Sequence, residues 1–361
     1  MEIERRVALR FHPEAVAANT HVNLSAVRSD GESLWLAGDE TATVERLSPE
    51  EAGFGGQREF RLADLVDLPG PPEQEADIEG LARSGGWLWA IGSHSLIRKR
   101  VKPTHSDAKA IRRLSRIRLD ENRYVIARLA VQDGPDGLPE LVKSTDDGRT
   151  SALFGAAGEP NLANLLAEDE HLAPFLAIPA KDNGFDVEGL AVHGETLYVG
   201  LRGPVLRGFA VVLELLPEEA APGRLRLVPI EGERCYRKHF LDLGGLGVRD
   251  LCPHGPDLLV LAGPSMDLDG PVRVYRWHGA AAMDTSAVAR GDELTVELEL
   301  PYGEGDDHAE GIALLPGPAG EDSTRLLVVY DSPAVHRRSG EDVVLADVVR
   351  LPAPRGPAVS A

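Results

Sequence analysis

The sequence predicts an all-β protein with the fold of a β-propeller. Three observations support this: a short acidic motif recurs along the chain, a strand-like segment follows each copy, and turn-forming residues are frequent. The 361 residues include 38 Gly and 26 Pro, which favour many turns and therefore short strands. Hydrophobic residues make up 43% of the chain, which is enough for a core and excludes a disordered or collagen-like protein.

The recurring motif defines the expected blades. It is clearest at residues 77–82 (DIEGLA) and 186–191 (DVEGLA), and it returns in altered form at 308–313 (HAEGIA). Weaker copies occupy residues 23–27 (NLSAV) and 248–252 (VRDLC). A repeat of roughly 40–60 residues with three or four strands is typical of a propeller blade. We therefore prefer five blades. Six remain an alternative, because the step between the two clearest copies is about twice as long as the others.

Two further strands are expected after each motif. The second strands are expected at residues 34–38, 88–92, 197–200, 258–261 and 326–329. The third strands, in which apolar and polar residues alternate as strands require, are expected at residues 43–47, 114–119, 210–215, 272–276 and 343–350. Strands from both ends of the chain are expected to close the ring.

The remaining organisation follows from composition. A short helical insertion is expected near residues 161–175, where apolar residues have helical spacing. Residues 1–351 are predicted to form one propeller domain, and residues 352–361 a flexible tail. No stretch has the apolar length of a membrane span, and the start lacks the apolar core of a secretory signal, so we expect a cytoplasmic protein. Cys235 and Cys252 are too few for a disulfide framework.

Aligning the motif copies places acidic residues in register. The third motif position holds Ser25, Glu79, Glu188, Asp250 and Glu310. The first strand of a propeller blade lines the central channel, so these carboxylates are expected to surround the axis. Like charges gathered so closely are costly unless a cation lies between them. The alignment therefore predicts a divalent metal ion, Ca²⁺ or alternatively Mg²⁺ or Mn²⁺. Its expected ligands are Glu79, Glu188, Asp250 and Glu310.

The first motif position carries a second set of polar residues. It holds Asn23, Asp77, Asp186, Val248 and His308. Positions one and three of a strand share a face, so Asp77 and Asp186 are further channel candidates. A structural alternative is open for both sets. A carboxylate followed by Gly at a strand start also serves as a turn device, or as a hydrogen-bonding staple between blades.

The ends of the second strands add polar residues at one matched position. That position holds Asp39, Ser93, Arg202, Gly263 and Asp331. Such variety indicates an asymmetric site on a symmetric scaffold. Arg202 is expected to anchor an anionic group, and His94 and His308 are expected to transfer protons or bind metal. Asp39 and Asp331 are further channel candidates. The alternatives are an ion-pair role for Arg202 and structural roles for the histidines.

Charge is distributed unevenly along the chain. The formal net charge of −20 disfavours nucleic acids and membranes as partners. Residues 98–118 are the exception, because they contain nine Lys or Arg and one acid, which leaves −28 on the rest of the chain. We expect a projecting hairpin that binds a small anionic ligand or a protein partner. Pairing of this hairpin with the protein's own acidic surface is the alternative.

Several segments together resemble a known family. They are residues 77–82, 92–95 (GSHS) and 181–191 (KDNGFDVEGLA). They resemble a bacterial family of uncharacterised propeller proteins over roughly residues 20–350. The Glu-Gly-Leu-Ala element is also similar to that of phytase-like and esterase-like propellers. Because acidic residues in phytase propellers bind calcium and substrate phosphate, this wider resemblance implies metal ligands at Glu79, Glu188 and Glu310.

These residues predict a metal-dependent hydrolase that acts on a small phosphorylated or ester substrate in the channel. The metal would polarise the substrate and activate water, Arg202 would hold the anion, and His94 or His308 would transfer protons. No nucleophile elbow, phosphate-binding glycine loop, dinucleotide fingerprint or HExxH zinc motif is present in the sequence. The alternative is a non-catalytic propeller that serves as a binding or interaction module.

Overall fold

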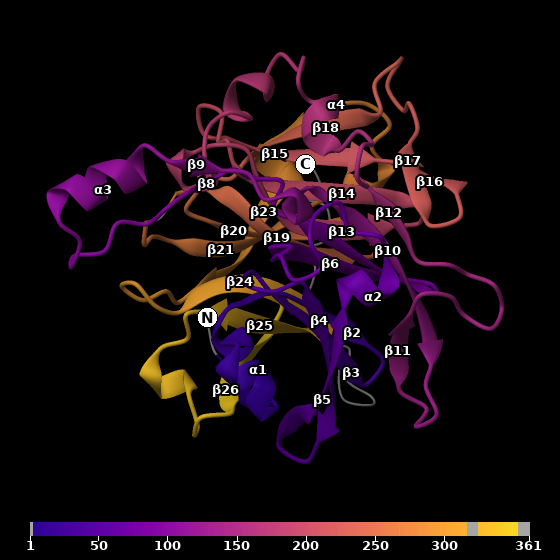
Figure 1. The fold of residues 1–361 in the computed structure, drawn as a ribbon, viewed down its shortest axis with the longest axis vertical. Helices are drawn as coiled ribbons and strands as arrows, with labels where there is room; N and C mark the ends of the chain where they lie inside the picture. Colours follow the sequence, from indigo (N-terminus) through magenta and orange to yellow (C-terminus); the bar gives the residue numbers. More distant parts are fainter. Residues whose placement is uncertain (1–2, 267, 316–323, 353–361) are drawn as a thin grey trace, which may run out of the picture.

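Five blades surround a central axis in the computed structural model, which describes residues 3–266, 268–315 and 324–352 (Figure 1). Each inner strand contacts the inner strands of both neighbouring blades, so the ring is closed. The predicted propeller fold and the preference for five blades are confirmed. None of the helices formed by the described residues is both long and apolar enough to cross a bilayer.

Each blade begins with an inner strand that pairs antiparallel with the next strand along the chain. The inner strands are β2 (Leu24–Asp30), β6 (Ile78–Ser84), β13 (Asp186–His193), β19 (Gly247–His254) and β24 (His308–Leu315). The second strands are β3 (Ser33–Gly38), β7 (Trp87–Gly92), β14 (Thr196–Gly203), β20 (Asp257–Gly263) and β25 (Arg325–Asp331). The third strands are β4 (Thr43–Glu50), β10 (Ile126–Asp133), β15 (Phe209–Leu215), β21 (Val272–Trp277) and β26 (Val343–Arg350). The outer strands are β5 (Gly53–Arg61), β11 (Pro139–Val142) with β12 (Ala152–Phe154), β18 (Tyr236–Asp242), β23 (Leu294–Leu300) and β1 (Ile3–Arg10).

One predicted strand is wrong. The third strand of the second blade was expected at residues 114–119, but β10 occupies that place beside β7. Residues 114–119 instead follow α3 (Asp107–Leu114) and contain only the short strand β9 (Ile117–Arg118), which pairs with β8 (Ile97–Arg98). The alternation of apolar and basic residues imitates a strand, yet the apolar side chains of this segment remain exposed.

The two ends of the chain close the ring, as predicted. Strand β1 forms the outer edge of the fifth blade, where Leu9 pairs antiparallel with Val344 of β26. The same strand also pairs parallel with β5, the outer strand of the first blade. This contact requires glycine, because a Cβ added at Gly53 would lie 2.1 Å from the carbonyl oxygen of Ala8. Hydrogen bonds therefore join the first and last blades at their outer edges.

The core consists of apolar clusters between neighbouring blades. The glycine of the recurring motif allows the inner strands to approach one another. A Cβ added at Gly80 would lie 2.7 Å from the Cβ of Leu190 on the next inner strand, and one at Gly311 would lie 3.0 Å from the amide nitrogen of Val27. The motif thus has two parts: a polar residue, and a glycine that allows neighbouring blades to approach closely.

The helical insertion predicted near residues 161–175 is confirmed. It contains α4 (Leu162–Leu165), which Asn161 caps, and the 3-10 helix η3 (Ala173–Phe175). The other short elements are α1 (Pro13–Ala17), α2 (Leu62–Leu65), η1 (Thr20–Val22), η2 (Glu121–Tyr124), η4 (Ala180–Asp182), η5 (Ala280–Ala282), η6 (Gly291–Glu293), η7 (Val335–Arg337), β16 (Pro217–Ala221), β17 (Arg224–Leu227) and β22 (Ala287–Ala289). The predicted tail lies outside the described residues from residue 353 onward.

A buried ion pair crosses the channel between the inner strands. The guanidinium of Arg28, from the first blade, binds both carboxylate oxygens of Asp250 at 2.6 and 2.9 Å. It also donates to the carbonyl oxygens of Leu190, Leu251 and Ile312, at 2.7, 2.6 and 2.9 Å. These acceptors belong to the third, fourth and fifth blades. One side chain therefore links four of the five inner strands inside the channel.

We expect Arg28→Met to lower the free energy of unfolding by about 3–5 kcal/mol, because it leaves the buried carboxylate of Asp250 without its cation. The double variant Arg28→Met/Asp250→Leu should recover most of the loss, since no charge then remains buried. Urea unfolding of the two variants measures both effects. The matched control is Arg5→Met on the exposed side of β1. A double variant as unstable as Arg28→Met would contradict the assignment.

Candidate functional site

A ring of bulged residues lies at the end of the channel where the inner strands begin. Each inner strand contains one residue that interrupts its pairing register with the second strand. A β-bulge of this kind redirects a side chain. The bulged residues are Ser25, Glu79, Glu188, Arg249 and Glu310. The predicted alignment is correct for four blades and wrong for the fourth, where Asp250 follows the bulge and pairs with Leu261.

The residues at the second-strand ends are equivalent, as the alignment assumed. On each inner strand, the residue just before the bulge pairs with a residue of the second strand. The next residue along that second strand is the equivalent one in every blade. They are Asp39, Ser93, Arg202, Gly263 and Asp331. The ring and these strand ends together form what we call the channel mouth. Its candidate residues come from all five blades.

Two arginines, one from the third blade and one from the fourth, bind carboxylates of the third and fifth blades. Arg202 contacts Asp186 at 2.5 Å and Glu188 at 2.6 Å. Arg249 contacts Glu188 at 3.1 Å and Glu310 at 2.5 Å. Both guanidinium groups are therefore engaged by the protein's own carboxylates. The ion-pair role that the sequence left open for Arg202 is the one seen here.

Burial strongly affects the ionisation of this network. It raises the pKa of Glu188 to about 7 and that of Asp186 to about 6, although the neighbouring arginines oppose the rise. Burial alone would lower the pKa of Arg202, but the negative charges of Asp186 and Glu188 outweigh burial and raise it. The arginines therefore stay charged while the carboxylates titrate near neutral pH. Perturbed ionisation of this kind is concentrated at functional sites.

Asp77 has a cationic partner that the sequence analysis missed. Arg123, from η2, forms ion pairs with both Asp77 and Glu75. Burial raises the pKa of Asp77 to about 6, and Arg123 limits the rise. Arg123 lies outside the recurring motif, in the connection between the second and third strands of its blade. Only the folded chain brings it to the channel mouth.

Glu79 and Asp39 differ from their neighbours at the channel mouth. Among the described residues neither side chain forms a hydrogen bond or an ion pair, and one carboxylate oxygen of Asp39 is buried. Burial, and then the negative charges of Asp77 and Asp331, raise the pKa of Asp39 to about 8. Burial, followed by repulsion from Asp77 and Glu188, raises the pKa of Glu79 well above its usual range. A cation at this position would relieve the repulsion.

The two predicted histidines lie in different environments. His94 is buried, its Nδ1 is 2.8 Å from the carbonyl oxygen of Gly92, and its ring packs edge-on against Tyr124. Burial lowers the pKa of His94 to about 4, which leaves the ring neutral. No carboxylate pairs with it among the residues described here. His94 therefore does not join the carboxylates of the channel mouth.

His308 lies between two carboxylates beside a small pocket. Its Nε2 is 3.3 Å from Asp269, and its Nδ1 is 3.8 Å from Asp331. The interaction with the nearby carboxylate of Asp331 raises the pKa of His308, burial opposes this, and Asp269 adds to the rise. The pocket has a volume of about 20 Å³, and its lining includes Arg249, Glu310 and Tyr302. The titratable side chain of His308 therefore lies beside Arg249 and Glu310 of the ring.

The predicted metal ligands do not form one ligand set. Asp250 lies deeper in the channel and is bound by Arg28, while Glu188 and Glu310 share the guanidinium of Arg249. Within the described part of the chain no three His, Cys, Asp or Glu side chains converge closely enough to hold an ion. The donor set predicted for Ca²⁺, Mg²⁺ or Mn²⁺ thus does not fit a metal on the axis.

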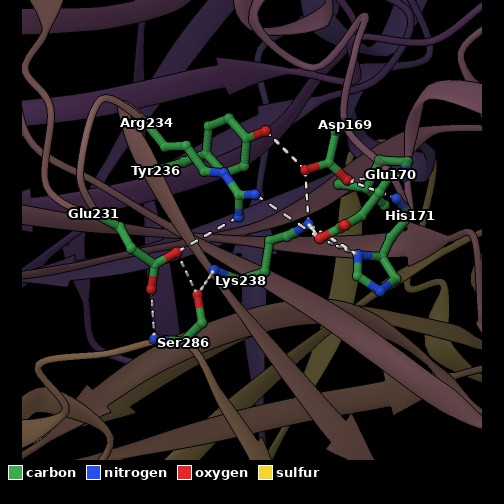
Figure 2. Close-up of polar contacts among 9 residues, drawn as sticks. Asp169, Glu170, His171, Glu231, Arg234, Tyr236, Lys238 and Ser286 are labelled. Atoms are coloured by element: carbon green, nitrogen blue, oxygen red, sulfur yellow. Dashed lines mark hydrogen bonds and ion pairs between the residues drawn. The ribbon is translucent and has the colours of Figure 1, made fainter.

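A second polar cluster, which the sequence analysis missed, lies away from the channel mouth. Figure 2 shows the buried ammonium of Lys238 directed at Asp169 and His171. Its Nζ is 2.7 Å from Asp169 and 2.9 Å from Nδ1 of His171, and Tyr236 donates to the same Asp169 oxygen at 2.7 Å. Although burial opposes it, these hydrogen bonds lower the pKa of Asp169. The cluster joins the helical insertion to β18.

Comparison with known proteins supports the predicted resemblance to an uncharacterised family. A family model described as "Protein of unknown function (DUF3616)" matches residues 23–347. No curated protein matches the chain significantly.

Similar solved structures have low sequence identity to this chain. The glutaminyl cyclase of Myxococcus xanthus is 12% identical, with a TM-score of 0.41 over 96% of this chain and 97% of that one. The Cps50 (Swd1) β-propeller domain of Myceliophteria thermophila is 11% identical, with a TM-score of 0.34 over 96% and 99%. The PQQ-bound aldose sugar dehydrogenase of Streptomyces coelicolor is 15% identical, with a TM-score of 0.36 over 96% and 98%. Likenesses this distant carry no argument about the site.

We expect opposite stability effects from two substitutions at the channel mouth. Glu79→Gln should raise the free energy of unfolding by about 0.5–2 kcal/mol, because burial and repulsion from Asp77 and Glu188 disfavour the ionised form of this carboxylate. Arg202→Met should lower it by about 3–5 kcal/mol, because Asp186 and Glu188 then lose their cation. Urea unfolding in alkaline buffer measures both changes.

The effect of Glu79→Gln should depend on pH in one direction. Because the pKa of Glu79 is raised in the folded state, the folded chain keeps this proton to a higher pH than the unfolded chain. Wild-type stability therefore falls as the pH rises above the unfolded pKa, and the advantage of the variant should grow over the same range. An advantage that is equal in acidic and alkaline buffer would contradict this.

Proposed function

Because the chain belongs to the DUF3616 family, whose function is unknown, we propose its role from the channel mouth: it binds a small molecule that carries a positively charged group. One observation carries this proposal. Glu79 and Asp39 form no direct ion pair with the described residues, whereas Asp77, Asp186 and Glu188 next to them are each paired with arginine.

The energetics of these carboxylates support a binding role. Partly burying a carboxylate without a partner costs free energy, and the raised pKa values of Glu79 and Asp39 reflect that cost. A ligand ammonium or guanidinium group would supply the missing charge-assisted hydrogen bonds. The surrounding ion pairs hold the neighbouring carboxylates in place, so a ligand would meet a preorganised site. Proteins often retain a destabilising group of carboxylates of this kind where their function requires it.

The test uses the full chain and simple cationic probes. Thermal unfolding near pH 8, where Asp39 titrates, should be shifted upward by at least one of spermidine, L-arginine and choline. Glu79→Gln and Asp39→Asn should each remove that shift. The exposed substitution Glu51→Gln serves as the matched control. Equal shifts in wild type and Glu79→Gln would contradict the proposal, as would a response to Ca²⁺ or Mn²⁺ alone.

A second candidate function is hydrolysis of a small phosphorylated or ester substrate in the pocket beside His308. The observation that favours it is the pairing of His308 with Asp269 and Asp331 next to Arg249. A histidine between two carboxylates can accept a proton from an attacking water and return it to the leaving group. Arg249 would attract the anionic group of the substrate.

Hydrolysis is tested with panels of phosphoester, carboxylic ester and lactone substrates. His308→Gln should abolish any turnover by the wild type, whereas His193→Gln, at an exposed position, should leave it unchanged. Each reaction is repeated with EDTA and with added Ca²⁺ or Mn²⁺, which measures any dependence on metal separately. Turnover that survives in His308→Gln would exclude this histidine as the proton-transfer group.

A further inference from the structure

The basic segment forms an arm that projects from the propeller. In Figure 1, α3 lies outside the body, connected to it through β8 and β9. Two ion pairs attach the base of the arm: Arg98 contacts Asp182 at 2.7 Å, and Arg118 contacts Asp120 at 2.6 Å. We call residues 98–119 the basic arm. It leaves the body near the channel mouth, since Asp182 lies just before β13.

The basic arm exposes an apolar face. The exposed fractions are 67% for Ile111, 52% for Leu114, 47% for Ile117 and 55% for Leu119. No residue of α3 is buried. Ile111 and Leu114 are three residues apart and share one side of the helix, while the basic side chains of α3 occupy the other side. A cluster of exposed apolar side chains on a projecting helix is typical of a docking element.

Most charges of the basic arm have no carboxylate partner among the described residues. Apart from Arg98 and Arg118, no basic side chain of the arm forms an ion pair with a described carboxylate. These side chains are Lys99, Arg100, Lys102, Lys109, Arg112, Arg113 and Arg116. The arm therefore does not fold back onto the protein's own acidic surface. Its partner has to bring negative charge from elsewhere.

We propose that the basic arm docks on the acidic body of a second copy of this chain. The argument is charge complementarity: the rest of the chain carries −28, so a second copy attracts the arm. The same −28 would be repelled by the phosphates of an anionic membrane or a nucleic acid as the arm approached. A second copy is therefore the partner that the charges of the whole molecule favour.

The body also offers an apolar surface with acidic neighbours. Leu268 and Tyr302 are 60% and 49% exposed, and both line the opening of the pocket beside His308. Glu304 and Asp306 lie in the same loop as Tyr302. This surface matches the arm in both respects, since it presents apolar side chains and negative charge. We assign it as the acceptor for the arm of the second copy.

Arm and acceptor belong to the same chain, so two copies can exchange arms around a twofold axis. In Figure 1 the loop that leads into β24 projects on the same side of the view as α3. Two such contacts per dimer would reinforce each other. Because dimerisation is measured without any ligand, its failure would leave the proposed function of the channel mouth untouched.

Sedimentation velocity of the full chain across the micromolar range tests the proposal. Wild type should form dimers at low salt and dissociate at high salt, because exposed charges are screened. Arg112→Glu/Arg113→Glu and Ile111→Glu/Leu114→Glu should each weaken dimerisation by about tenfold or more. The matched controls are Arg5→Glu and Val335→Glu, exposed positions away from the arm. Since none of the substituted side chains is buried, loss of folding should not obscure the result.

A charge exchange tests the acceptor. Glu304→Lys/Asp306→Lys should dimerise poorly alone, and mixing it with Arg112→Glu/Arg113→Glu should restore association through one wild-type contact and one charge-reversed contact. A wild type that stays monomeric at low salt would overturn the proposal. So would arm variants that dimerise like wild type, or wild type that binds phosphatidylserine vesicles without forming dimers.

Discussion

The burial of charge along the propeller axis is the constraint on which this structure depends. Five inner strands that meet around a channel leave backbone carbonyls and side chains facing a narrow space. In the middle of the channel, Arg28 meets that constraint by binding Asp250 and carbonyl oxygens of three other blades. Both terminal nitrogens of Arg28 bind Asp250 and backbone carbonyls, so the charge is tolerated and the inner strands are linked.

At the channel mouth, only some of the buried charges are neutralised by direct ion pairs within the protein. Arg202 and Arg249 neutralise the carboxylates of the third and fifth blades, and Arg123 neutralises Asp77. Glu79 and Asp39 are the described carboxylates of this group that form no direct ion pair. A propeller scaffold repeats its backbone geometry five times, but its charges are not repeated. The carboxylates without a direct ion pair therefore lie in the first and second blades, which is why the ligand that we propose for the channel mouth is cationic.

Much of the candidate site was predictable because the motif repeats. Glu79, Glu188 and Glu310 share a bulged position, and the strand ends at Asp39, Arg202 and Asp331 match as the alignment required. In the fourth blade the alignment was wrong by one residue, because it matched Asp250 with the acidic residues of the other blades. The bulged residue is Arg249, and the sequence alone does not reveal where a bulge lies. His94 also resembled a site residue, because it follows the end of a second strand, but its side chain is buried.

The sequence by itself determined the propeller fold, a preference for five blades over six, the closure of the ring by both ends of the chain and the acidic character of the channel mouth. These features depend on local patterns, such as alternation, turns and repeated motifs. Only the tertiary structure decided which charges are paired. Arg28, Arg123 and Arg249 come from positions that no repeat marks as cationic, and their partners are distant in sequence. Ion pairing depends on distances between blades, and local sequence does not contain those distances.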